Sequence, residues 1–153
     1  MRWTEVTASL TPDIYSEIVN RFTAGRGYAY LAARSAEQNA DATAVLRYLE
    51  QALHYLRDVQ GMLAEHTAAT AQPPPADSAA PVTPMPWQAF LATRQPADAR
   101  RLAAALTDAV YYARHTAEAI TGDGEYAWLL RRLGDTMACL ALARRLSALL
   151  LFV

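Results

Sequence analysis

Residues 45–63 read VLRYLEQALHYLRDVQGML, and this stretch decides the fold. Its apolar residues recur in alternating steps of four and three, at positions 45, 49, 52, 56, 59 and 63. That spacing places them on one side of an α-helix, in which roughly 3.6 residues make a turn. Most of the positions between them hold polar or charged residues. The stretch therefore predicts a long amphipathic helix with one buried face.

The first long helix of the chain has a clear start signal. Thr11 can cap a helix N-terminus, Pro12 fits the first helical position, and Asp13 favours the positive end of a helix. An apolar stripe of helical period follows these residues. Gly25 and Gly27 then predict that this helix ends there.

The segments on either side of this helix are less regular. Residues 1–10 have no helical period, so we expect an extended arm that its apolar residues tie to the body. The segment 28–69 fits either one helix with a weak middle or two helices joined near residues 39–41. We favour two helices, because Asp41 can cap the second one.

Prolines divide the second half of the chain from the first. Six of the eight prolines lie between positions 73 and 86, which predicts an exposed linker over residues 70–86. A short helix is expected at 87–93, and Pro96 opens a long one. The Thr-Gly-Asp-Gly run at 121–124 predicts a turn, in which Asp123 can cap the last helix.

Together these segments predict an all-α protein, a four-helix-type bundle of two helical hairpins joined by the proline-rich crossover linker. We expect one domain over residues 1–153, because a hairpin of about 70 residues buries too little surface alone. Its parts are the arm at 1–10, a first helical half at 11–69, the linker, and a second half at 87–153. The sequence shows no repeat of fixed period.

Composition limits the classes of function. The chain has 14 basic and 15 acidic residues, and all the basic ones are arginine. At a net charge of −1, nucleic-acid binding through bulk charge is not expected. Cys139 is the only cysteine, which excludes a disulfide scaffold and is typical of a small core residue.

Location and assembly follow from other features of the sequence. There is no signal-peptide pattern and no apolar run near the roughly 20 residues that span a bilayer, so we expect a cytoplasmic protein without membrane contact. The richness in alanine and arginine is typical of a GC-rich bacterial genome. The apolar end at 149–153 favours a homodimer or a protein partner, because such a tail is unfavourable in water.

Arg47 and His54 form one candidate site. They are seven residues apart, so they lie on the same side of a helix, away from the apolar stripe. The Arg-x6-His spacing resembles the short motif of HEPN-type RNases, small helical dimers in which arginine and histidine line an RNA-cutting cleft. The resemblance implies metal-independent RNA cleavage, although Tyr48 stands where that family commonly has a small polar residue. The alternative is a solvated face on which Glu50 pairs with His54 and Arg57.

A second candidate site surrounds His115. Tyr111 and Tyr112 come four and three residues before His115, and Glu118 comes three residues after it. All of them can therefore lie along one side of a helix. Such a cluster is typical of a ligand pocket or of an interface. We expect no metal site, because the matched Glu-x-x-His motifs of di-metal bundles are absent.

The motifs of the common enzyme classes are also absent, including the phosphate-binding glycine loops and the nucleophile elbow. The sequence therefore favours a non-enzymatic interaction or regulatory protein that acts through its helix faces, with no cofactor. The alternatives are the HEPN-like RNase with Arg47 and His54 as catalytic residues, and a bundle that binds a small ligand or a metal.

Overall fold

The computed structural model describes residues 1–67 and 84–148, and within these ranges all regular structure is helical apart from two isolated bridges. The predicted all-α class is therefore confirmed. The helices are α1 (Trp3–Ala8), α2 (Pro12–Glu37), α3 (Ala42–His66), α4 (Trp87–Ala92), α5 (Pro96–Thr121) and α6 (Tyr126–Ala148).

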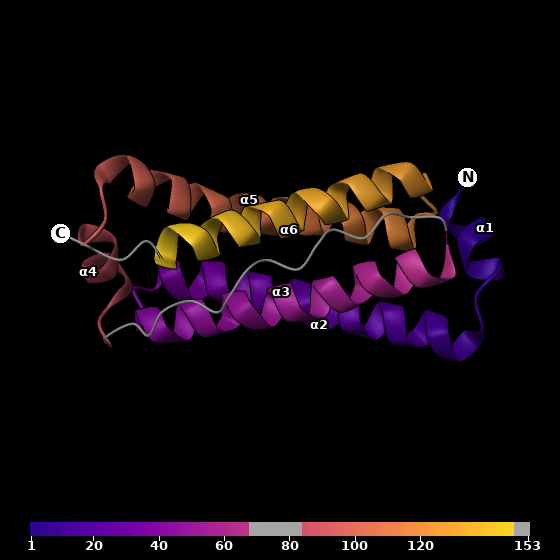
Figure 1. Cartoon of the computed structure of the whole chain (residues 1–153), viewed down its shortest axis with the longest axis horizontal. Helices are drawn as coiled ribbons and strands as arrows, with labels where there is room; N and C mark the ends of the chain where they lie inside the picture. The colour runs from indigo at the N-terminus through magenta and orange to yellow at the C-terminus, as the bar shows by residue number, and fades with distance from the viewer. Residues whose placement is uncertain (68–83, 149–153) are drawn as a thin grey trace.

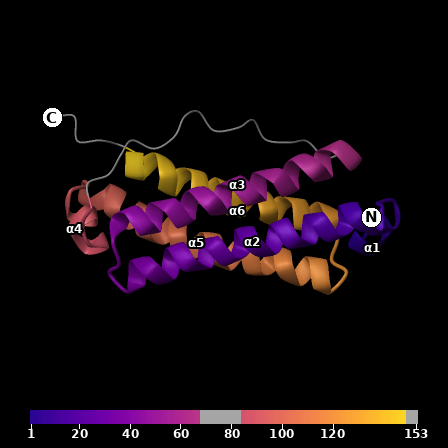
Figure 2. The ribbon, with the colours of Figure 1, turned by 90° about the horizontal axis from the view of Figure 1, so that it is seen from below.

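The four long helices form an elongated bundle of two antiparallel hairpins (Figure 1). One hairpin is α2 and α3, the other is α5 and α6, and they pack through α3 against α6 and α2 against α5. The two views agree that α1 and α4 cover opposite ends of the bundle (Figures 1 and 2). Fully buried leucines fill the interior, among them Leu49, Leu53, Leu56, Leu63, Leu102, Leu129, Leu133 and Leu140.

The predicted helix starts are mostly confirmed. The Thr11 side chain accepts a hydrogen bond from the backbone N–H of Ile14 at 3.3 Å, and α2 begins at the next residue. Asp41 caps α3 by accepting from the backbone N–H of Thr43 at 2.9 Å. The short helix after the linker and the start at Pro96 are also present.

The prediction that the first helix ends at Gly25 and Gly27 is wrong, because α2 runs unbroken through both. Gly25 is buried where α2 meets α3, and a β-carbon added to it would stand 2.8 Å from Leu56. This glycine therefore permits the close approach of two helices instead of ending one. The hairpin turns at residues 38–41, where Asn39 has a φ of 54°.

The expected extended arm is also wrong. Residues 3–8 form α1, and its Trp3 and Val6 side chains are each only 2% exposed. These two side chains are three residues apart, which places them on one face of a helix. Six residues are too short to show a period in the sequence, so burial of that face is what makes the segment helical.

Asp123, the predicted cap of the last helix, caps a different helix. Its carboxylate accepts a hydrogen bond from the backbone N–H of Thr4 at 2.8 Å, in the first turn of α1. The last helix, α6, begins at Tyr126. The cap prediction failed because the N-terminus of α1, and not that of α6, lies beside this carboxylate.

An internal repeat organises the chain, so the expectation of no fixed period is wrong. The helices α4, α5 and α6 begin 84 positions after α1, α2 and α3. Trp3 and Trp87 occupy equivalent positions, as do Pro12 and Pro96. Most equivalent positions hold different residues, which is why the period is hard to recognise in the sequence.

The same hydrogen bonds close both ends of the bundle. At each end, two backbone hydrogen bonds join the first residue of a short helix, and the residue two positions before it, to the opposite hairpin where its turn meets its second helix. They are Trp3 N to Gly124 O (2.9 Å) and Tyr126 N to Met1 O (2.8 Å) at one end, and Trp87 N to Ala40 O (2.8 Å) and Ala42 N to Met85 O (2.7 Å) at the other. Each residue of the first pair of hydrogen bonds is 84 positions away from its equivalent in the second pair. The two halves are thus related by a pseudo-twofold axis perpendicular to the bundle.

Two expectations fall largely outside the described residues. The predicted linker at 70–86 is described only from residue 84 onward, and the apolar chain end at 149–153 is not described. Among the helices of the described ranges, none combines the length and apolarity needed to cross a membrane.

Candidate functional site

An open groove of about 650 Å³ lies between α2 and α5. We call it the α2–α5 groove. Its volume is within the roughly 300–1,000 Å³ of typical small-molecule sites. The side chains that give it chemical character are Arg26, Tyr30, Arg34 and Glu37 of α2 and Tyr111 and Arg114 of α5.

Helical spacing brings the α2 side chains to one wall of the α2–α5 groove. Arg26, Tyr30 and Arg34 recur every four residues, which aligns them along one face of α2. Sequence reasoning missed this row because it ended the helix at Gly25 and Gly27. The i, i+4 spacing was the signal that could have revealed it.

The α2–α5 groove is positively charged. Arg26, Arg34 and Arg114 line it, and none of the three forms an ion pair with any residue that the structure describes. The Arg114 guanidinium instead lies 5.8 Å from the centre of the Tyr111 ring. Glu37 is the one acidic residue among the lining side chains. The wall therefore carries more positive than negative charge.

Gly27 of α2 also lines the groove. A β-carbon added to it would stand more than 4 Å from every described atom beyond its own stretch of helix, so the packing of the described residues gives no steric reason for a glycine here. Glycine inside a helix costs roughly 1 kcal/mol relative to alanine. The equivalent residue of the second half, 84 positions later, is Tyr111, a large side chain on the opposite wall. The two halves thus differ where the groove is widened.

The cluster predicted around His115 is partly present. The ring centres of Tyr111 and His115 are 4.2 Å apart, and those of Tyr112 and His115 are 6.4 Å apart. Glu118 is exposed, and among the described residues no ion pair joins its side chain to this cluster. The structure therefore brings together three of the four predicted residues, and Tyr111 also lines the α2–α5 groove.

Two residues of α6 complete this cluster, and the sequence analysis did not find them. Trp128 stacks on His115 with ring centres 6.2 Å apart. The guanidinium of Arg132 lies 4.0 Å from the centre of the Trp128 ring and forms a 3.0 Å ion pair with Asp135. Because the stacking of Trp128 on His115 and the 5.1 Å approach of the Arg132 guanidinium to the Tyr112 ring both cross between helices, we interpret this part of the cluster as a clamp between α5 and α6.

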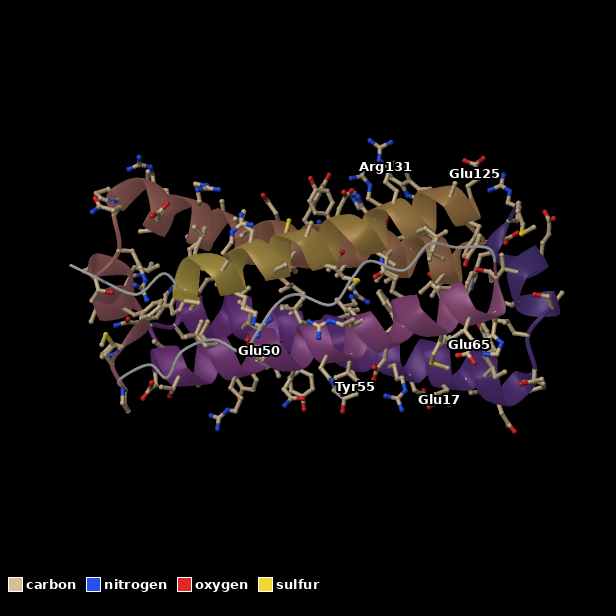
Figure 3. The ribbon with its side chains drawn as sticks, in the orientation of Figure 1. Glu17, Glu50, Tyr55, Glu65, Glu125 and Arg131 are labelled. Carbon is tan, nitrogen blue, oxygen red and sulfur yellow. The ribbon has the colours of Figure 1, made fainter. Side chains whose placement is uncertain are left out.

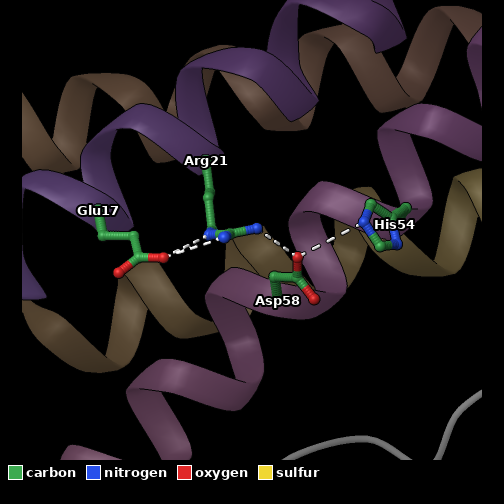
Figure 4. A network of polar contacts seen from close by, with 4 residues as sticks. All are labelled: Glu17, Arg21, His54 and Asp58. Carbon is green, nitrogen blue, oxygen red and sulfur yellow. Dashed lines mark hydrogen bonds and ion pairs between the residues drawn. The ribbon is translucent and has the colours of Figure 1, made fainter.

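Arg47 and His54 are both exposed, but no contact joins them among the described residues. The His54 Nε2 atom is 3.7 Å from an Asp58 carboxylate oxygen, which also accepts a 2.7 Å hydrogen bond from Arg21. Figure 4 shows this chain of polar contacts extending to Glu17 on α2. The arrangement is a surface network between α2 and α3.

The predicted pairing of Glu50 with His54 and Arg57 is wrong. Glu50 instead forms a 2.6 Å ion pair with Arg144 of α6. The Arg144 side chain is 11% exposed, so this pair is partly shielded from water. The sequence could not show it because the partner is on another helix.

Cys139 packs against the hydrophobic core, as the sequence indicates. Burial raises the pKa of its thiol to about 11, with smaller contributions from the negative charges of Asp108 and Asp135. Among the described residues, no three histidine, cysteine or acidic side chains lie together as a set of metal ligands.

Comparison with known proteins adds no assignment. No protein-family model, no curated protein and no solved structure matches this chain. The α2–α5 groove is therefore interpreted from its own geometry and chemistry.

Proposed function

We propose that this protein is a non-enzymatic binding module whose α2–α5 groove holds a small organic ligand. The observation that carries the proposal is the open space above Gly27. No described residue outside α2 comes within 4 Å of a β-carbon placed there, and the glycine that leaves the space open weakens its own helix. A ligand that fills the space accounts for both features.

This proposal makes more specific the expectation of a protein that acts through its helix faces. Two tyrosines with large exposed surfaces, Tyr30 at 51% and Tyr111 at 47%, border the groove. Exposed aromatic rings beside a concave surface are typical of binding sites. Among the described residues no hydrogen bond, ion pair or ring contact joins Arg47 to His54, so we do not base the function on RNA cleavage.

The proposal can be tested with a neutral dye and two substitutions at one position. N-phenyl-1-naphthylamine is an uncharged aromatic compound whose fluorescence rises in apolar sites. Gly27→Trp fills the open space, whereas Gly27→Ala adds only a methyl group that the space accepts. We expect the wild type and Gly27→Ala to bind the dye and Gly27→Trp to lose most of the binding. Circular dichroism checks that both variants stay folded.

Equal dye binding by all three proteins would contradict the proposal, because the dye would then bind elsewhere. Absence of binding to the wild type would also contradict it, and would leave this face for a macromolecular partner.

A further inference from the structure

We infer that the ligand of the α2–α5 groove is an amphiphilic organic anion. Its anionic group lies between Arg26 and Arg114, and its apolar part extends toward Tyr30 and Val110. This inference rests on the proposed function and adds the chemical class and the orientation of the ligand.

Arg26 and Arg114 lie on opposite walls, displaced in the same direction from the boundary between two hollows. Ala33 of α2 and Thr107 of α5 mark this boundary, because both line the groove and also the smaller hollow of about 150 Å³ beside it. Arg26 is seven residues before Ala33, and Arg114 is seven residues after Thr107. Because α2 and α5 run antiparallel (Figure 1), both steps lead in the same direction along the groove.

The internal repeat shows what stands at the equivalent positions of the groove. The residues equivalent to Arg26 and Arg114 in the other half are Val110 and Tyr30, each 84 positions away. The pseudo-twofold axis therefore exchanges the level of the groove that holds two arginines with the level one helical turn away, which holds an aliphatic and an aromatic side chain. Two neighbouring levels with the same backbone geometry thus differ in chemistry: one is cationic, and the next is apolar and aromatic before the groove continues to Arg34 and Glu37.

The acidic side chain that lines the groove is far from Arg26. Glu37 is 11 residues after Arg26 on α2, which is about 16 Å along a helix. It is only three residues from Arg34 and can offset the charge of that residue. Glu118 is one turn after Arg114 on α5, but it does not line the groove. Arg26 and Arg114 form no ion pair among the described residues, so an anion from outside the protein can neutralise them.

Guanidinium groups are well suited to carboxylate and phosphate groups, which accept two parallel hydrogen bonds from one arginine. Two arginines that face each other across a groove can bind one such group from both sides. The adjoining Tyr30 and Val110 then contact the apolar part of the same molecule. Carboxylates and phosphates share this chemistry, and competition experiments separate them.

The test compares two dyes with the same aromatic rings. The dye 8-anilinonaphthalene-1-sulfonate is N-phenyl-1-naphthylamine with one sulfonate added. We expect the sulfonate dye to bind the wild type roughly tenfold more tightly than the neutral dye, and Arg26→Gln or Arg114→Gln to remove most of this difference. The neutral dye is measured on the same variants, so that loss of the charge contact is distinguished from a general change of the groove.

Arg131→Gln is the matched control. Arg131 is exposed on α6, and its side chain points away from the bundle (Figure 3). We expect this variant to bind both dyes like the wild type. If the two dyes bind equally well, or if Arg131→Gln weakens the sulfonate dye as much as Arg26→Gln does, the inference is contradicted. The proposed function stands in that case as long as Gly27→Trp still abolishes binding of the neutral dye.

Decanoate and 1-naphthyl phosphate then serve as competitors for the bound sulfonate dye. Displacement by decanoate identifies the anion as a carboxylate, and displacement by the phosphate identifies it as a phosphate monoester. Failure of both compounds to displace the dye contradicts the inference.

Discussion

Asn39 and Asp123 occupy equivalent positions in the two halves and have the same backbone φ of 54°. Each side chain accepts a hydrogen bond at 2.8 Å from a short helix of the opposite half. Asn39 accepts from the backbone N–H of Gln88, and Asp123 accepts from that of Thr4. Each hairpin turn thus caps the helix that covers it, and the halves are joined in the same way at both ends.

The difference between these two caps leads to a prediction about pH. Hydrogen bonds from Thr4 hold the pKa of Asp123 below its ordinary value, assisted by the charge of Arg2 and opposed by desolvation. A carboxyl group with a lowered pKa in the folded state stabilises the fold above its ordinary pKa. This contribution is lost as the pH falls through the lowered value.

We therefore expect Asp123→Asn, which keeps an acceptor but does not titrate, to lose less stability in acid than the wild type. Urea unfolding at neutral pH and at decreasing acidic pH measures the difference. Asn39→Asp is the reciprocal variant and should lose more stability in acid. An identical pH dependence for all three proteins would show that the cap carboxylate is not linked to folding.

The repeat makes Leu49 and Leu133 equivalent core residues. They are 84 positions apart, and both are fully buried. Leu49→Ala and Leu133→Ala should each lower the free energy of unfolding by about 2–5 kcal/mol, because each leaves a cavity. Urea unfolding followed by circular dichroism provides the values. Two separate transitions in either variant would argue against a single cooperative unit formed by both halves.

Two glycines of α2 should respond to alanine in opposite directions. Gly27→Ala should raise the free energy of unfolding by about 0.5–1 kcal/mol, because the added methyl group meets nothing and alanine favours the helix. Gly25→Ala should lower it, because the methyl group would stand 2.8 Å from the buried Leu56. Thermal unfolding of the two variants side by side tests this contrast, and stabilisation by both would be inconsistent with the packing of α2 on α3.

Cys139 should be chemically inert in the folded protein. A pKa of about 11 keeps its thiol protonated at neutral pH, and the thiolate is the reactive form. We expect slow reaction with 5,5′-dithiobis(2-nitrobenzoic acid) in buffer and fast reaction in concentrated urea. A fast reaction in buffer would mean that the thiol is accessible and its pKa is not raised.

The sequence was sufficient where local signals determine the structure. Thr11, Asp41 and Pro96 mark helix starts through their own side-chain chemistry, and the structure has helices there. Gly25 and Gly27 led to the wrong prediction of a helix end. Glycine also occurs inside helices, at Gly25 where two helices pack closely and at Gly27 beside open space. Nothing in the local sequence distinguishes these roles from the end of a helix.

Contacts between distant segments could not be read from the sequence. Asp123 caps α1 and Glu50 pairs with Arg144, and both partners are far away along the chain. The groove was missed for the same reason, since Arg26 and Arg114 belong to different halves. The internal repeat was the one sequence signal that relates these halves, and few identical residues preserve it.

The most direct test of the account is to locate the bound dye by nuclear magnetic resonance. The protein is labelled with nitrogen-15 and titrated with 8-anilinonaphthalene-1-sulfonate, and the shifts of the backbone amide signals are mapped onto the structure. A second hollow of about 430 Å³, lined by Val6, Tyr126 and Leu130 among others, offers an alternative location. We expect the largest shifts at Gly27 and Arg114, in the α2–α5 groove. The largest shifts around the second hollow would contradict the account.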